Sequence, residues 1–221
     1  MTNQRYKNLI IDAVLFDLDG VIIKSMEQHL EAWQYAFAEF GAHITAADFY
    51  ELEGRGVRVV SELLAEKFKI PLTQAPEIMR KKNAYYDKIA RIEYYEGLFP
   101  LLQDLKAHNK KMAIITGSIR KRVRKLTNGR LNGFFSAFVT SEDVEHTKPF
   151  PEPFLRGADL LKVEPQNCIV IENAPLGIEA AKRAGMTVFA VASTVPVEKL
   201  DAADYIFPSL IEVHRRIMNI I

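Results

Sequence analysis

The sequence has little of several features that mark specialised protein classes. Its single cysteine, Cys168, excludes an internal disulfide, and we expect a reducing compartment, the cytoplasm. No apolar run approaches the ~18 residues that a membrane helix needs, and the N-terminal residues contain no signal-peptide core. A large excess of positive or negative residues is also missing, since the sequence has 29 basic and 28 acidic residues. Neither nucleic acid nor an anionic membrane is therefore expected as a partner.

What is present is typical of a globular chain. Hydrophobic residues make up 48% of the sequence and charged residues 26%, which allows a substantial core. Short apolar runs with strand character lie at 13–16, 111–116, 136–140, 167–172, 187–191 and 204–207. Helical patterns separate the later runs, as from Pro175 to Arg183 with Gly185 as the stop. Strands that alternate with helices predict an α/β fold with a parallel sheet.

The segment between the first two runs is different. Met26, Leu30, Trp33, Phe37 and Phe40 recur at helical spacing. Further helical patterns follow around 63–68 and 78–92, and no convincing strand occurs among them. We therefore predict a helical cap domain over residues 24–95, inserted into an α/β core formed by residues 1–23 and 96–221.

Polar side chains follow several of the predicted strands. Ligands of open α/β sheets bind beyond the carboxyl ends of the strands, so we expect these side chains to meet. Carboxylates there suit Mg²⁺, whereas a hydroxyl, backbone amides and a lysine suit a phosphoryl group. The residues are Asp17, Asp19, Thr116, Gly117, Ser118, Asp143, Lys148, Glu172 and Asn173.

Four of these segments together resemble the motifs of the haloacid dehalogenase superfamily. They are DLDGV at 17–21, ITGS at 115–118, KPFP at 148–151 and IENAPLG at 171–177. The resemblance is greatest to the subgroup of β-phosphoglucomutases and sugar-phosphate phosphatases, which carry a helical cap between the first two motifs. It implies a Rossmann-like parallel sheet with that cap. The stretch 17–33 also resembles the β-phosphoglucomutase N-terminus, including its functional histidine, here His29.

The resemblance assigns catalytic roles to the first motif. Asp17 would be the nucleophile that forms an aspartyl-phosphate, which splits one difficult displacement into two easier ones. Asp19 would protonate the leaving group and later deprotonate the attacking water. An acid at this second position favours phosphate-ester chemistry over dehalogenation.

The second and third motifs would hold the phosphoryl group. Thr116, the Gly117 amide and Ser118 would bind its oxygens, with Thr116 counted among the catalytic residues. Lys148 would offset the negative charge between Asp17 and the phosphoryl. The basic run 120–125 could also attract phosphate, but its spacing favours a solvated helix face.

Mg²⁺ is the implied cofactor. Its ligands would be Asp17, the backbone carbonyl of Asp19, Glu172 and Asn173. The family usually has Glu-Asp or Gly-Asp where this chain has Glu172-Asn173, and a hard dication prefers carboxylate to amide. We therefore predict weaker Mg²⁺ affinity unless Glu172 or Asp143 compensates.

Cap residues would determine specificity. His29 would either steer Asp19 or the substrate, or serve only as a cap or hinge histidine. Arg55, or Arg58 beyond it, could grip a second phosphate or a hydroxyl from a glycine-flanked loop, although a flexible exposed turn is the alternative. Lys82 resembles a cap position that faces substrate. Closing of such a cap excludes water from the site.

These features predict Mg²⁺-dependent hydrolysis of a small phosphomonoester, such as a sugar phosphate. One alternative is a phosphomutase of the β-phosphoglucomutase type, which His29, Arg55 and Lys82 keep open. Another is a non-catalytic protein that binds phosphorylated ligands, which Asn173 suggests. The expected partner is a small phosphorylated metabolite, and the expected state is a monomer or a weak homodimer.

Overall fold

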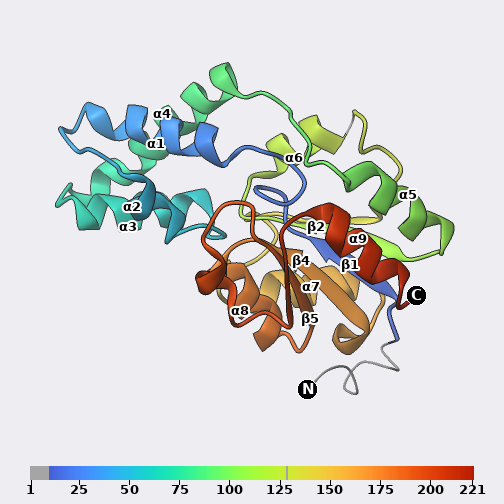
Figure 1. The fold of residues 1–221 in the computed structure, drawn as a ribbon. Helices are drawn as coiled ribbons and strands as arrows, with labels where there is room; N and C mark the ends of the chain where they lie inside the picture. Colours follow the sequence, from blue (N-terminus) through green and yellow to red (C-terminus); the bar gives the residue numbers. More distant parts are fainter. Residues whose placement is uncertain (1–9, 128) are drawn as a thin grey trace.

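One part of the molecule is built around a parallel β-sheet (Figure 1). The computed structural model describes residues 10–127 and 129–221. Within them the sheet has six strands in the order β3-β2-β1-β4-β5-β6, and every neighbouring pair is parallel. The strands are β1 (Ala13–Phe16), β2 (Lys111–Ile115), β3 (Ala137–Val139), β4 (Cys168–Glu172), β5 (Thr187–Val191) and β6 (Tyr205–Phe207).

Helices cover both faces of this sheet. Because successive side chains of a strand point to opposite faces, Val14 and Phe16 of β1 belong to one buried cluster and Ala13 and Leu15 to another. The first cluster includes residues of α5 (Leu98–Ala107), α6 (Arg120–Thr127) and α9 (Leu210–Met218). The second includes residues of α7 (Glu152–Leu161) and α8 (Pro175–Arg183). Burial of the strands on both faces explains why their sequences are almost wholly apolar.

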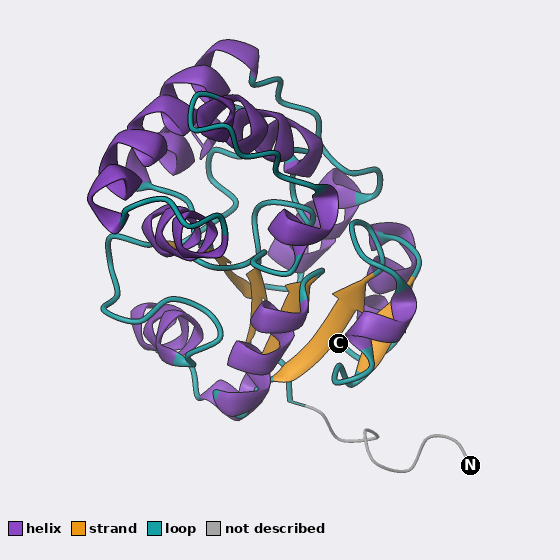
Figure 2. Cartoon of the chain, turned by 90° about the vertical axis from the view of Figure 1, so that its left-hand side faces the viewer, coloured by secondary structure: helices purple, strands orange, loops and turns teal. Residues whose placement is uncertain are grey.

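A helical part lies to one side of the sheet (Figures 1 and 2). It contains α1 (Met26–Ala38), α2 (Ala46–Tyr50), α3 (Val57–Lys67) and α4 (Ala75–Ile89). These helices share a hydrophobic cluster of their own around Trp33 and Phe37. The two connections to the sheet lie side by side, since the Lys24 amide donates to the Glu93 carbonyl at 2.8 Å. A separate core supports the description as a cap, and the boundaries 24–95 stay a prediction.

The predicted elements agree closely with the observed ones. All six strands are present, with ends that differ from the predicted runs by at most one residue, and the helix Pro175–Arg183 is found as predicted. Short 3₁₀ helices add Leu72–Gln74, Pro165–Asn167 and Val197–Leu200. The sequence reading missed α2, which has five residues and begins with a capping box between Thr45 and Asp48. None of the helices in the described ranges is long and apolar enough to cross a bilayer.

Candidate active site

Asp17 lies directly after β1 and is linked to the end of β4 by a buried lysine. Its amide donates to the Ile171 carbonyl at 3.0 Å, which continues the pairing of the two strands. Lys148 Nζ lies 2.5 Å from Asp17 Oδ1 and 2.6 Å from Glu172 Oε1. All three side chains are buried. The structure thus brings together three residues that the sequence placed at the carboxyl edge of the sheet.

The burial of this group has electrostatic consequences. Burial raises the pKa of Asp17 to about 7, although the nearby Lys148 ammonium opposes the shift. Burial alone would lower the pKa of Lys148, but the carboxylates of Asp17 and Glu172 outweigh it and raise the pKa above its usual value. Lys148 therefore stays cationic. Further positive charge near Asp17 would favour the ionised carboxylate that a nucleophile must be.

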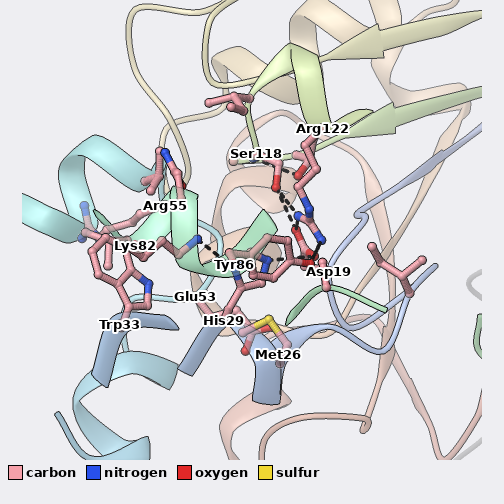
Figure 3. A pocket seen from close by; sticks show the side chains of 18 of the residues that line it. Asp19, Met26, His29, Trp33, Glu53, Arg55, Lys82, Tyr86, Ser118 and Arg122 are labelled. Atoms are coloured by element: carbon pink, nitrogen blue, oxygen red, sulfur yellow. Dashed lines mark hydrogen bonds and ion pairs between the residues drawn. The ribbon is translucent and has the colours of Figure 1, made fainter. Parts of the chain in front are cut away.

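Asp19, two residues on, is held by side chains from both parts of the molecule (Figure 3). Arg122 donates to both carboxylate oxygens, each at 2.6 Å. Ser118 Oγ donates to Oδ2 at 3.0 Å, Ser25 Oγ donates to Oδ1, and His29 Nε2 lies 3.3 Å from Oδ1. Burial would raise the pKa of Asp19, but the Arg122 guanidinium, and next His29, hold it well below its usual range.

Arg122 corrects the expectation that the basic run 120–125 is a solvated face. Lys121 and Lys125 are exposed as expected, but the Arg122 side chain is only 12% exposed. Its guanidinium also donates to the Tyr86 hydroxyl at 2.7 Å and lies 4.8 Å from that ring's centre. Leu126 of the same helix is buried and lies four residues after Arg122, hence on the same face. That spacing was the signal in the sequence that could have identified Arg122.

His29 connects Asp19 to a lysine of the cap. Lys82 Nζ lies 2.9 Å from His29 Nδ1, and the His29 ring stacks on Tyr86 with centroids 4.2 Å apart. Burial, and next the Lys82 ammonium, lower the pKa of His29 to about 3, so the imidazole is neutral. Nδ1 then accepts from Lys82 while Nε2–H donates to Asp19. Of the two roles considered for His29, this geometry favours the one that involves Asp19.

Lys82 lies inside the cap in an apolar setting. Its ammonium sits 5.3 Å from the centre of the Trp33 ring and 5.0 Å from that of Tyr86. Burial, and next the charge of Arg122, lower the pKa of Lys82 to about 7. An anionic ligand beside Lys82 would restore its positive charge.

Residues 53–56, the cap loop, connect α2 to α3 and meet the core at the second motif. Thr116 follows β2 and is buried, and its Oγ1 accepts from the Ser118 amide at 3.0 Å. A Cβ added to Gly117 would lie 2.5 Å from the carbonyl oxygen of Arg55. Only glycine lets the loop lie this close to the core. The absence of a side chain at 117 therefore serves the contact with the cap as well as access to the amide.

The two candidate arginines, Arg55 in the cap loop and Arg58 in α3, differ clearly. Arg58 is on the outside, where its side chain is 70% exposed and donates to Glu62 at 2.9 Å. Arg55 lines the central cavity, and its buried Nε has no hydrogen-bond partner among the described residues. Arg55 is therefore the arginine placed to meet a ligand.

A cavity of about 630 Å³ lies between the cap and the core. Figure 3 shows side chains of both parts facing it. Apolar walls with a few convergent polar groups are typical of small-molecule sites. The polar side chains that could bind a ligand or take part in a reaction are Asp17, Asp19, Arg55, Lys82, Thr116 and Arg122.

Asn173 occupies the position where the sequence raised doubt about a metal. It is fully buried, and its Nδ2 donates to Glu53 Oε1 and, at 2.8 Å, to Thr194 Oγ1. Its Oδ1 is buried and has no hydrogen-bond partner in the part of the chain that the structure describes. Glu172 Oε2 accepts from the backbone N–H of Asn173 at 2.7 Å, which fixes the position of this carboxylate. Asp17 and Asn173 follow the paired strands β1 and β4. A carboxylate and an unpaired amide oxygen fit a hard cation such as Mg²⁺.

Other acids contribute differently from what the sequence suggested. In the described residues, no three or more His, Cys, Asp or Glu side chains stand together as a metal cluster. Asp143, one of the two acids considered as compensation for Asn173, accepts from Thr140 and pairs with Arg120, and it is not among the residues that line the cavity. Glu53, which sequence reasoning missed beside Arg55, is buried against Asn173. Burial, and next the charge of Glu172, raise the pKa of Glu53 well above its usual range.

Comparison with known proteins gives consistent matches. Residues 14–191 match the family described as haloacid dehalogenase-like hydrolase. A fructose-1-phosphate phosphatase of Escherichia coli is 30% identical over 186 residues, covering 83% of this chain and 95% of that protein. A validoxylamine A 7'-phosphate phosphatase of Streptomyces hygroscopicus is 30% identical over 205 residues, covering 90% and 94%. The crystal structure of a β-phosphoglucomutase from Clostridium difficile is similar with a TM-score of 0.83 at 28% identity, covering 95% and 96%.

Proposed function

The chain belongs to the haloacid dehalogenase-like hydrolases, and from this we propose that it hydrolyses a small phosphomonoester through an aspartyl-phosphate on Asp17, with Mg²⁺ as the cofactor. The observation that carries the proposal is the Lys148 ammonium 2.5 Å from Asp17 Oδ1. It places a fixed positive charge beside a carboxylate at the bottom of a ligand-sized cavity. Sugar phosphates are the first substrates to test, because the relatives include a fructose-1-phosphate phosphatase.

In the first half-reaction, an Asp17 oxygen attacks the phosphorus and the bond to the leaving alkoxide breaks. Asp19 gives its proton to the leaving oxygen of the substrate. Thr116 and the backbone amide of Gly117 bind the phosphoryl oxygens, and Lys148 balances their charge together with that of Asp17. Asp17, the Asp19 carbonyl, Asn173 and Glu172 would hold Mg²⁺, which would supply further positive charge to the site.

In the second half-reaction, Asp19 takes a proton from water, which attacks the phosphorus and releases Asp17 and inorganic phosphate. Asp19 must carry a proton before the first step, yet in the described state it is paired with Arg122. The dianionic phosphoryl group of a substrate competes for the same guanidinium. Transfer of Arg122 from Asp19 to the substrate would therefore help Asp19 to become the acid.

A second candidate is a phosphomutase of the β-phosphoglucomutase type. The specific observation in its favour is the chain of contacts from Lys82 through His29 to Asp19. Arg55 lines the same cavity, and its Nε has no hydrogen-bond partner within the described ranges. A mutase must retain a second phosphate while it returns the first, and these cations suit that task. Conversion of β-glucose 1-phosphate to a 6-phosphate without release of inorganic phosphate would identify the mutase.

The test of the proposed function is phosphate release from a generic aryl phosphate and from a set of sugar phosphates, with and without Mg²⁺. The wild type should release phosphate, and Asp17→Asn should abolish release. Asp19→Asn should lose about 10²–10⁴-fold, the usual contribution of a positioned acid–base group. Binding of phosphorylated ligands without any turnover would instead favour the non-catalytic alternative.

A further inference from the structure

Glu53 and Asn173 form a buried contact between the cap loop and the core. Glu53 lies between α2 and α3, and Asn173 follows β4, 120 residues later. Glu53 is 5% exposed and Asn173 is fully buried. Thr194, after β5, donates to Glu53 Oε2 at 3.1 Å and completes a triangle with both residues. The buried carboxyl group of Glu53 thus accepts a hydrogen bond from the side-chain amide of Asn173, the residue that stands where the family usually has a carboxylate.

These contacts determine which way the Asn173 amide faces. Both hydrogens of Nδ2 have acceptors, one in Glu53 and one in Thr194. Rotation of the amide by half a turn would put its oxygen against those two oxygens, and both hydrogen bonds that Nδ2 donates would be lost. Oδ1 therefore stays on the other side of the group, where it is buried and finds no donor among the residues that the structure describes. A Cβ added to Gly20 would lie 3.0 Å from this oxygen, so the amide packs against the backbone that follows Asp19.

An asparagine side chain must be held in one orientation to ligate a cation, whereas an aspartate side chain need not be. Either oxygen of an aspartate can ligate a cation, but an asparagine offers oxygen on only one side. A buried acceptor without a partner destabilises the fold, and a hard cation would supply the missing partner. Groups that orient a metal ligand commonly change metal affinity about 10–100-fold when they are removed.

We propose that Glu53 is a positioning residue for Mg²⁺: with Thr194 it holds the Asn173 amide so that Oδ1 is presented to the cation. The inference rests on the Mg²⁺ requirement of the proposed function and extends it to the cap. Because Glu53 belongs to the loop that also covers Gly117, the metal site is complete only while this loop is docked. By reciprocity, a bound cation favours the docked loop.

The experiment measures Mn²⁺ affinity from the paramagnetic resonance signal of free Mn²⁺, without substrate. The proteins are the wild type, Glu53→Leu, Asn173→Asp and the double variant. Glu53→Leu should weaken binding by about tenfold in the wild-type background. In the Asn173→Asp background the same change should cause no loss, because a carboxylate needs no orientation. Glu53→Gln, whose amide oxygen still accepts from Nδ2, should retain most of the affinity.

Two further variants guard this design. Thr194→Val removes the other acceptor from the core side and should also weaken binding about tenfold, even if Glu53→Leu disturbs the cap. Asp143→Asn removes an acid outside the cavity and should leave Mn²⁺ affinity unchanged. Equal affinity of the wild type, Glu53→Leu and Thr194→Val would overturn the positioning role, as would an equal loss in both backgrounds. A wild type that binds no Mn²⁺ would instead overturn the metal requirement of the proposed function, together with this inference.

Discussion

Arg122 binds both carboxylate oxygens of Asp19 at 2.6 Å, in the fork geometry that arginine forms with a carboxylate. The pair is partly buried, and the Ser118 hydroxyl also donates to Asp19 at 3.0 Å. The proposed acid–base residue is therefore held ionised in the described state. Release of this pair is the step by which substrate binding would activate Asp19.

Arg122→Gln should raise the pKa of Asp19, because a neighbouring cation favours the ionised form and its loss favours the protonated one. The general acid must be protonated, so the alkaline fall of kcat/KM that reports Asp19 should move to higher pH. The value of kcat/KM should fall at least about tenfold, as expected when a charged hydrogen bond to the phosphoryl is lost. Full pH profiles with an aryl phosphate measure both effects.

Arg120→Gln is the matched control for this variant. It removes the same charge from the same helix, at a residue that pairs with Asp143 outside the cavity. Its pH profile should match that of the wild type. An Arg122→Gln profile that also coincides with the wild type would show that Arg122 does not govern Asp19.

Lys82→Met should stabilise the protein near neutral pH. Burial lowers the pKa of Lys82 to about 7, so between pH 7 and the lysine's ordinary pKa near 10.4 the unfolded chain binds the extra proton. Wild-type stability therefore gains up to about 1.4 kcal/mol per pH unit from this group as pH rises through that window. The advantage of Lys82→Met in urea unfolding should be largest at pH 7 and shrink by pH 9. An advantage independent of pH would contradict the shifted pKa.

Gly117→Ala should displace the cap loop from the core. Its Cβ would lie 2.5 Å from the Arg55 carbonyl oxygen, so backbone must move. We expect kcat/KM to fall about tenfold or more, since small misplacements of positioning groups are costly. Cleavage by a protease at 53–56 should become faster, while the melting temperature of the core changes little. Gly129→Ala, whose added Cβ would lie 3.7 Å from the Leu126 carbonyl oxygen in an ordinary contact, offers a control outside the site.

Much of the site was predictable because strand ends place residues reliably. Asp17 and Glu172 follow or end apolar runs that can only be central strands, so their meeting at one edge of the sheet follows from parallel pairing. Lys148 was predicted to lie in the same site because it belongs to the motif at 148–151. The paired strands also explain why the predicted sheet needed almost no correction.

The remaining site residues depend on relationships that local pattern does not express. Arg122 sits in a basic run, and only its helical register relative to Leu126 separates it from its exposed neighbours. Glu53 follows a short helix that the sequence reading missed, and its partner Asn173 is 120 residues away. The Asn173 amide was identified as a departure from the family pattern. The sequence left open whether Glu172 or Asp143 offsets this change, and the structure places Glu53, from the cap, against the side-chain amide.

The most direct test is a crystal structure of the protein with Mg²⁺ and beryllofluoride, which mimics an aspartyl-phosphate. The account predicts a bond between beryllium and a carboxylate oxygen of Asp17, with Lys148, Thr116 and the Gly117 amide contacting the fluorines. Asp17→Asn under the same conditions should show no such adduct. Beryllofluoride bound elsewhere, with the Asp17 carboxylate turned away from it, would contradict the central claim that this side chain accepts the phosphoryl group.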